Sequence, residues 1–381
     1  MKQSNDDGLN ASEIEWRCQR IRKALAANDL EALLIFSPAW RRENVRYLSD
    51  AALEASAAFA YLPSSGAVTA FACSNEDELS LRKSGFVSDI RLIDFPDVVH
   101  IADCIGADLR SGRIGLAGLE FLPQRIMAQL QALLPHIEFQ RASALMDSVR
   151  LVKSDLEISR LRAGGVICDK SWQAFLDACR PGAREFEIIA GVEARLRGEG
   201  AEDNFMIIAS GGTEVMGMTP PSDRRLKVGD LVRTELTPQT RGYWTQICRT
   251  AVIGEPSARQ KESFALFEEA VAAGIAVIKP GVTAHDVAKA ENDVFRRHGY
   301  GEYCTSEYTR VRGHCLGLHL DEYPILEDES TVLEKNSVLI VHPNTYTPLA
   351  GYFVLGDPVV VTERGAERLL STPRQLSVVP V

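Results

Sequence analysis

The first part of the sequence alternates short apolar runs with helical stretches, and few architectures accommodate that pattern. Ala32–Phe36 is an apolar run closed by a Ser-Pro pair, which is typical of a buried strand. Ala57–Leu62 and Ala67–Cys73 are two further runs of this kind, and the Pro-Ser-Ser-Gly segment between them indicates a turn. Glu13–Ala27 has the pattern of an amphipathic helix. Because such elements alternate, residues 1–147 are predicted to form an α/β domain.

The rest of the chain, 148–381, has longer helical stretches and a hairpin pattern. Ser154 precedes a helical stretch and is followed three positions later by Glu157, which is the spacing of a capping box. Leu231–Leu236 and Ile247–Ile253 are apolar runs on either side of a Gly-Tyr pair, so we expect them to form paired strands. A chain of 381 residues is long enough for two domains of about 150 residues or more. We therefore predict an α+β fold with domains at 1–147 and 148–381.

The composition excludes several classes of partner. The chain has 42 Lys and Arg residues against 52 Asp and Glu, a net charge of −10, and such a surface repels nucleic acids and anionic membranes. No apolar run reaches the length of about 18 residues that a membrane-spanning helix needs, and the polar N-terminus is unlike a secretory signal. Eight cysteines occur without a Cys-x-x-Cys pair, which is typical of free thiols in a reducing compartment. We expect a cytoplasmic protein that binds neither nucleic acid nor membrane.

Seven phrases in the second half of the chain have a recognisable order and spacing. They are Val152-Lys-Ser-Asp-Leu-Glu-Ile158, Ile208-Ala-Ser-Gly-Gly212, Asp223-Arg-Arg-Leu-Lys-Val-Gly-Asp230, Gly242-Tyr-Trp-Thr245 with Arg249-Thr250, Gly313-His-Cys-Leu-Gly317, Asp321-Glu-Tyr-Pro324 and Val341-His-Pro343. With these phrases the sequence resembles the family of creatinase, prolidase and aminopeptidase P. The resemblance implies a pita-bread catalytic domain behind a smaller α/β N-terminal domain, usually in a homodimer.

The same resemblance indicates how the site is altered. Peptidases of this family hold two metal ions with Asp, Asp, His, Glu and Glu side chains, and here these positions fall on Glu235, Gln246, His314, His342 and Gly356. A two-metal centre needs bridging carboxylates to offset the charge of two dications, but the two bridging positions are Gln246 and Gly356. The sequence therefore predicts that the protein is not a two-metal peptidase and needs no metal cofactor.

Glu235, His314 and His342 are the predicted catalytic residues. Glu235 lies on a predicted buried strand, where a carboxylate is costly unless it is paired or neutralised. Glu235 could take a proton from water, while one of the two histidines gives a proton to the leaving nitrogen. The alternative for Glu235 is a structural ion pair with Arg249 or Arg312, and the alternative for the histidines is a role in the core.

Six further residues are predicted to bind the substrate. They are Gln246, Asp321, Glu322, Tyr243, Arg41 and Arg42. The two acids could instead form salt bridges with Arg310 or Arg312, and Tyr243 could belong to the core. Gln246 could merely fill the space of the missing metal. The resemblance to creatinase-like dimers implies that the two N-terminal arginines close the pocket of the neighbouring subunit, and the alternative is a solvated charge cluster.

One main functional hypothesis and two alternatives follow from these residues. The main hypothesis is a metal-independent, creatinase-like catabolic hydrolase that cleaves a C–N bond of a small non-peptide substrate by Glu/His acid–base catalysis, with creatinase and ectoine hydrolase as family precedents. The first alternative is a mononuclear enzyme, hydrolase or lyase, in which Glu235, His314 and His342 hold one divalent metal ion. The second is a non-catalytic pita-bread module that binds a peptide or protein.

Overall fold

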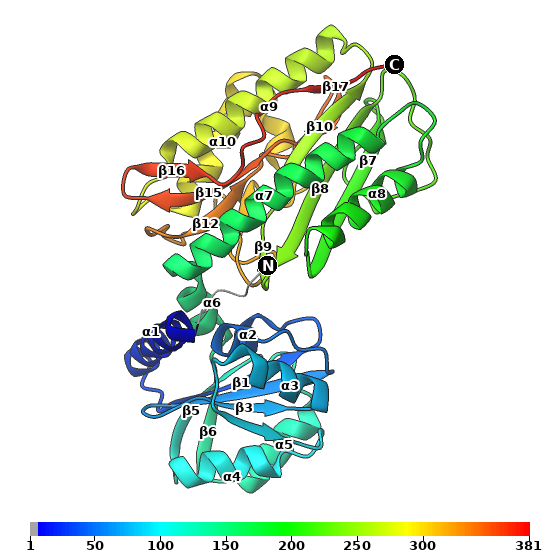
Figure 1. Ribbon diagram of the computed structural model, residues 1–381. Coiled ribbons are helices and arrows are strands. Elements are labelled where there is room, and N and C mark those ends of the chain that lie inside the picture. Colours follow the sequence, from blue (N-terminus) through cyan, green and yellow to red (C-terminus); the bar gives the residue numbers. More distant parts are fainter. Residues whose placement is uncertain (1–6) are drawn as a thin grey trace. The chain divides into compact units, whose positions relative to one another are not determined.

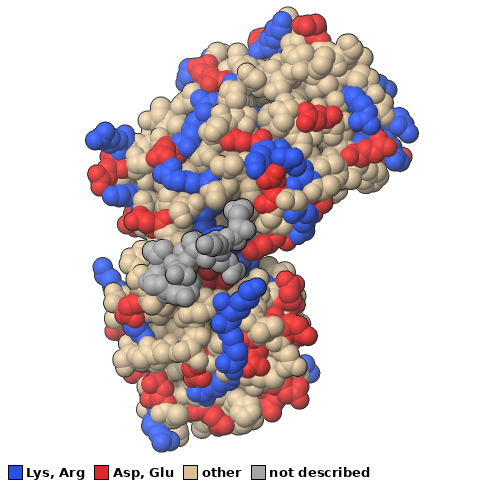
Figure 2. Space-filling model, in the orientation of Figure 1, with Lys and Arg blue, Asp and Glu red and all other residues tan. Residues whose placement is uncertain are grey.

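The computed structural model describes residues 7–381. The chain divides into two compact units, Met1–Arg150 and Leu151–Val381 (Figure 1). The sequence analysis placed the domain boundary between residues 147 and 148, and that exact position stays a prediction. Within the described residues, no helix is long and apolar enough to cross a membrane. On the visible face of the molecule, basic and acidic side chains are interspersed (Figure 2).

The N-terminal unit is built on a mixed six-stranded sheet in the order β4-β3-β2-β1-β5-β6. Helices cover both faces of this sheet (Figure 1), and every residue of β1 and β2 is buried, as the apolar runs predicted. The strands are β1 (Ala32–Pro38), β2 (Ala57–Pro63), β3 (Thr69–Ala72), β4 (Asp89–Leu92), β5 (Gly112–Ala117) and β6 (Ile137–Arg141). The helices are α1 (Asp7–Ala27), α2 (Glu43–Ser49), α3 (Asn75–Ser84), α4 (Val99–Asp108), α5 (Gln124–Leu133) and α6 (Ser143–Leu151). The helix predicted from Glu13 therefore begins earlier, at Asp7.

The C-terminal unit contains three sheets. A five-stranded sheet has the order β17-β10-β8-β7 with β9 paired to β8, a four-stranded sheet has the order β11-β12-β15-β16, and β13 pairs with β14. The strands are β7 (Asp203–Gly211), β8 (Leu231–Thr240), β9 (Tyr243–Trp244), β10 (Ile247–Ile253), β11 (Gly313–Cys315), β12 (Val338–Val341), β13 (Thr345–Thr347), β14 (Gly351–Phe353), β15 (Asp357–Thr362), β16 (Gly365–Arg368) and β17 (Ser377–Val379). The helices are α7 (Asp155–Ala178), α8 (Glu185–Gly198), α9 (Ala258–Val277) and α10 (Ala284–Arg297), with a 3-10 turn, η1 (Gly301–Cys304).

Two pairs of helices enclose these sheets. Side chains of α7 and α8, among them Trp172 and Ile188, form one core cluster with Val232 of β8. Side chains of α9 and α10, among them Phe267 and Phe295, form a second cluster with strands β12, β14 and β15. Figure 1 shows α7 and α8 over one side of the sheets and α9 and α10 on the other. This α+β arrangement of helix pairs around central sheets is the predicted pita-bread fold, and the fold class is confirmed.

Local signals in the sequence also predicted details of this unit. Ser154 accepts a hydrogen bond from the backbone N–H of Glu157, whose side chain accepts one from the backbone N–H of Ser154. The predicted capping box at the start of α7 is therefore confirmed. The predicted strand pair is present as well, because β8 and β10 run antiparallel with Ile247 opposite Leu236.

A buried carboxyl on α10 lacks a compensating hydrogen bond. Glu291 is fully buried, and neither of its carboxylate oxygens has a hydrogen-bond partner in the described part of the chain. It packs so tightly on α9 that a Cβ added at Gly274 would lie 2.7 Å from its Oε1. Desolvation raises the pKa of Glu291 well above its ordinary value, although the charge of Arg312 opposes this shift.

Replacing Glu291 by methionine should therefore stabilise the protein at pH 7, by about 1–3 kcal/mol. A carboxyl whose pKa is higher in the folded than in the unfolded state costs stability as the pH rises above the unfolded value of about 4.3. The variant lacks this cost, so its advantage over the wild type should grow between pH 5 and pH 7. Urea unfolding at both pH values measures the difference. A variant less stable than the wild type at pH 7 would instead mean that Glu291 compensates the charge of Arg312.

Candidate active site

A glutamate on the central strand of the five-stranded sheet forms the centre of the site. Glu235 lies on β8 and is partly buried. The amide nitrogen Nε2 of Gln246 donates a hydrogen bond to its Oε2 at 3.1 Å, and Nδ2 of Asn344 donates one to its Oε1 at 2.9 Å. Asn344 is itself oriented, because its Oδ1 accepts a hydrogen bond from the backbone N–H of Leu355 at 3.0 Å. Two neutral amides therefore hold the carboxyl group.

Glu235 does not form the ion pair with Arg249 or Arg312 that was its predicted alternative. Arg249 is bonded to Asp357 at 2.7 Å, and Arg312 donates to the backbone carbonyls of Pro343 and Tyr303. Without an arginine in contact, desolvation raises the pKa of Glu235 to about 7. The hydrogen bond from Asn344 and the charge of the more distant Arg310 moderate this increase. A carboxyl with this pKa can both accept and return a proton near neutral pH.

Two histidines lie close together in the adjoining four-stranded sheet. His314 is on β11 and His342 directly follows β12, and their ring centroids are 5.3 Å apart in an edge-to-face arrangement. Both side chains are buried, and burial lowers the pKa of each below its ordinary value. Nδ1 of His314 lies 3.8 Å from Oδ1 of Asp321. Asp321 in turn forms a 2.7 Å ion pair with Arg310, as one of the alternatives for this acid predicted.

Backbone neighbours connect the glutamate to the histidines. Cys248 on β10 lies opposite Glu235 in the strand register, and its carbonyl accepts a hydrogen bond from the backbone N–H of Gly356 at 3.0 Å. A Cβ added at Gly356 would lie 2.5 Å from the Cβ of His342. The structure thus brings together four predicted site residues around Glu235, namely Gln246, His314, Asp321 and His342.

The other predicted substrate-binding residues do not join this group. Tyr243 is fully buried and its hydroxyl donates to Glu157 at 3.0 Å, which matches the alternative of a core role. Glu322 forms a buried ion pair with Lys153 at 2.8 Å, rather than with an arginine. These contacts do not support a role for Tyr243 or Glu322 in substrate binding.

Arg41 and Arg42 belong to the N-terminal unit, where both have local partners. Arg41 pairs with Glu43 at 2.6 Å and lies over the ring of Phe121. Arg42 donates to the backbone carbonyls of residues 39 and 55. A role for either arginine at the pocket of a neighbouring subunit stays a prediction.

Asn344 is a member of the site that the sequence analysis missed. Residues 341–343 form one of the seven phrases, and Asn344 comes directly after them. Its contact with Glu235 joins residues 109 positions apart, so that only the folded chain reveals it. Its position beside a phrase with a predicted catalytic histidine was the available signal.

Comparisons with known proteins place the chain in a family. A model of the creatinase/prolidase N-terminal domain matches residues 17–152, and a model of metallopeptidase family M24 matches residues 159–363. The fold and these matches define a pita-bread protein with a creatinase/prolidase N-terminal domain. The chain belongs to metallopeptidase family M24, and its relatives support the prediction of a hydrolase that acts on C–N bonds.

Similar proteins include an Xaa-Pro dipeptidase of Pyrococcus furiosus, 33% identical over 242 residues that cover 63% of this chain and 68% of that protein. An Xaa-Pro dipeptidase of Pyrococcus horikoshii is 31% identical over 258 residues, which cover 67% of this chain and 72% of that protein. Among solved structures, the prolidase from Pyrococcus horikoshii superposes with a TM-score of 0.82 at 26% identity, over 95% of this chain and 99% of that chain.

This membership corrects the functional hypothesis made from the sequence. The prediction of a metal-independent, creatinase-like hydrolase of a non-peptide substrate is wrong, because the matched family is one of metallopeptidases and the similar proteins are Xaa-Pro dipeptidases. The prediction that no cofactor is needed is wrong on the same finding, and its alternative of one divalent metal ion is incomplete. The prediction that the chain is not a two-metal peptidase also conflicts with these relatives.

The side chains present nevertheless do not fit the two-metal centre that the family implies. Gly356 offers no ligand, and the side chain of His342 occupies the space that a side chain at 356 would need. Gln246 contributes a neutral amide, whose Oε1 has no hydrogen-bond partner among the described residues. Within residues 7–381 no group of three or more His, Cys, Asp or Glu side chains is arranged to hold a metal ion. We therefore assign no catalytic step to a metal.

Proposed function

We propose that the protein hydrolyses the C–N bond of a small peptide, of the Xaa-Pro kind named for its relatives, at the site around Glu235. One observation carries the proposal. Glu235 is a partly buried carboxyl with a pKa of about 7, held by two amide side chains. A group whose pKa lies near the working pH is the most effective proton carrier in a hydrolytic site.

Glu235 can carry out both proton transfers that amide hydrolysis requires. Ionised Glu235 accepts a proton from water while the water oxygen forms a bond to the carbonyl carbon. Protonated Glu235 then gives the proton to the nitrogen as the C–N bond breaks, and the carboxylate is regenerated. His314 and His342 are neutral because burial lowers their pKa values. We therefore assign them to hydrogen-bond donation toward the oxyanion, in place of protonating the leaving nitrogen.

The proposal is tested by incubating the purified full-length protein with Xaa-Pro dipeptides and with matched dipeptides that lack proline. Release of free amino acids is followed by chromatography, with and without added divalent metal ions. We expect turnover of at least one Xaa-Pro dipeptide. Absence of cleavage of every peptide under every metal condition would overturn the proposal.

We further propose a homodimer in which the N-terminal unit of one subunit closes the pocket of the other. The family resemblance supports this arrangement, and so does the indole of Trp40, which is 73% exposed in the single chain. Tryptophan is enriched at protein interfaces and is costly to leave in water. The eight free thiols support our further proposal of a cytoplasmic location.

Replacing Trp40 by alanine should weaken this dimer at least tenfold, because interface tryptophans are frequent hot spots. Light scattering across a range of protein concentrations measures the dissociation constant. Leu79→Ala is the matched control, since Leu79 is an exposed apolar residue of the same unit, 67% accessible, outside the Trp40–Arg42 segment. A wild-type protein that is monomeric at all concentrations, or a Trp40→Ala dimer of unchanged affinity, would contradict the proposal.

A further inference from the structure

Three tyrosines form a partly exposed cluster on the segments that adjoin the site. The rings of Tyr303 and Tyr308 are 5.0 Å apart, and the ring of Tyr346 lies 5.6 Å from Tyr303 and 6.0 Å from Tyr308. All three side chains retain partial exposure. Buried tyrosines would be explained by packing alone, but this group, which we call the tyrosine cluster, keeps aromatic surface available to a ligand.

The chain brings the cluster near Glu235, because Asn344, which donates to Glu235 at 2.9 Å, lies two residues before Tyr346. The hydroxyl of Thr345, between them, donates to the backbone carbonyl of Tyr303 at 2.6 Å. Tyr346 of β13 lies directly opposite Tyr352 of β14, and opposite residues of an antiparallel pair project from the same face. Desolvation raises the pKa of the Tyr352 phenol, and the charge of the nearby Glu235 carboxylate raises it further. Arg233 anchors this hairpin by donating to the backbone carbonyls of Tyr352 and Ala350. The hairpin that carries Tyr346 is therefore held in place directly after Asn344, the residue that binds the reactive carboxyl.

Two carboxylates, those of Glu302 and Glu307, act on the cluster, while the guanidinium of Arg312 donates to the backbone carbonyl of Tyr303. A hydrogen bond to the Glu302 carboxylate raises the pKa of Tyr303 to about 12, and the charge of Glu307 raises the pKa of Tyr308. A phenol that donates to a carboxylate has a more electron-rich ring, and electron-rich rings attract cations through their faces. Arg310, which follows this segment, is held by Asp321 at 2.7 Å and so does not neutralise the two glutamates.

We propose that the tyrosine cluster binds a cationic nitrogen of the substrate, such as the free ammonium group of a peptide. This inference rests on the proposed function, because it assigns one end of the peptide to Tyr303, Tyr308 and Tyr346 while the scissile bond lies at Glu235. Aromatic faces beside carboxylates are the arrangement by which proteins bind ammonium groups. The cluster then selects peptides with a free amino terminus over blocked ones.

The test separates binding from turnover by using a probe that cannot be hydrolysed. Tetramethylammonium is the cationic probe, and tert-butanol, of nearly the same shape, is the neutral one. Titration of the full-length protein, followed by the change in tyrosine fluorescence and by NMR, gives the affinity for each. We expect saturable binding of tetramethylammonium at least tenfold tighter than that of tert-butanol. Equal affinity for the two probes would overturn the inference, whether or not the protein cleaves peptides.

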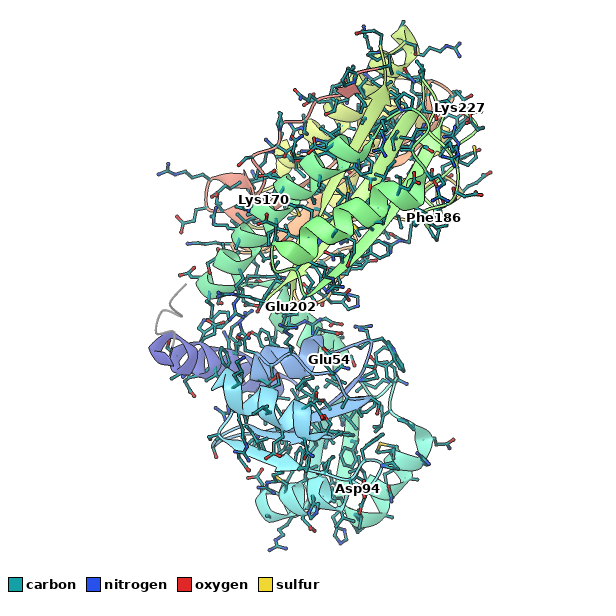
Figure 3. All side chains as sticks on the ribbon, turned by 45° about the vertical axis from the view of Figure 1, so that its right-hand side comes forward. Glu54, Asp94, Lys170, Phe186, Glu202 and Lys227 are labelled. Atoms are coloured by element: carbon teal, nitrogen blue, oxygen red, sulfur yellow. The ribbon has the colours of Figure 1, made fainter. Side chains whose placement is uncertain are left out.

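Substitutions locate the binding in the cluster. Tyr346→Leu and Tyr303→Leu should each weaken tetramethylammonium binding by about tenfold, whereas Tyr346→Phe should retain it within a factor of about three, because the aromatic face remains. Phe186→Leu is the matched control, since Phe186 is an exposed aromatic residue on α8 (Figure 3). Unchanged binding in both leucine variants would overturn the assignment. If the protein cleaves peptides but accepts N-acetylated ones equally well, the inference fails and the proposed function stands.

Discussion

Replacing Asp357 by asparagine should destabilise the C-terminal unit by about 3–5 kcal/mol. Asp357 is fully buried and is the shared partner of three arginines. Its Oδ1 accepts from Arg249 at 2.7 Å, and its Oδ2 accepts from Arg368 at 2.6 Å and from Arg374 at 3.0 Å. Removing the negative charge leaves Arg249, itself fully buried, without a counterion. Because Asp357 adjoins Gly356, the same loss should also disturb the strand start beside His342.

The pH dependence of stability provides a second measure of this ion cluster. Burial alone would raise the pKa of Asp357, but the charges of Arg249 and Arg368 outweigh it and hold the pKa below its ordinary value. A carboxyl of this kind contributes stability above its unfolded pKa of about 3.9, and that stability is lost as the pH falls through the folded pKa. The difference between wild type and Asp357→Asn should therefore be largest near pH 7 and shrink below pH 4.

Urea unfolding at several pH values measures both effects. Glu268→Gln is the matched control, because Glu268 also accepts from Arg374, at 3.2 Å, but its side chain is 37% exposed. Exposed pairs contribute about 1 kcal/mol or less. If the Asp357→Asn protein were as stable as the Glu268→Gln protein at pH 7, the prediction would be wrong. Water would then solvate the three arginines well enough to replace the carboxylate.

The sequence predicted most of the elements that position the site. The apolar runs of β1 and β2, the capping box at Ser154 and the pairing of β8 with β10 all depend on local patterns, and all are confirmed. The family phrases predicted the pita-bread fold for the same reason, because each phrase is a short local signal at a fixed position in the chain.

Long-range contacts account for what the sequence did not predict. Glu322 was expected to bind substrate or an arginine, and its buried pairing with Lys153 joins residues 169 positions apart. The histidines were expected to carry protons, but the protonation state depends on burial, which only the packed sheets determine. The functional hypothesis failed differently. It inferred the loss of metal chemistry from single positions, whereas family membership rests on the whole domain.

Turnover should fall by a factor of about 10² or more when Glu235 is replaced by glutamine. Glutamine keeps the size of the side chain, and its amide oxygen can still accept from Asn344 while its amide nitrogen donates to Gln246 once the Gln246 amide rotates, so folding should be retained. It cannot accept a proton from water. Glu199→Gln is the matched control, because Glu199 pairs with Lys170 on α7 (Figure 3) and such partly exposed pairs have small effects. Kinetics of dipeptide cleavage measure the loss, and thermal unfolding confirms that both variants are folded.

The pH profile distinguishes a proton carrier from a residue that only shapes the pocket. If ionised Glu235 is the base, kcat/KM should rise with pH and level off above an apparent pKa of about 7, the value that desolvation produces at this position. Asn344→Ala removes a hydrogen bond that lowers this pKa, so the rise should move to higher pH while the plateau is less affected. A residue with a purely structural role would lower the rate equally at every pH. A flat profile in the wild type, or an Asn344→Ala profile that does not move, would therefore remove Glu235 from the proton transfer even if Glu235→Gln were inactive.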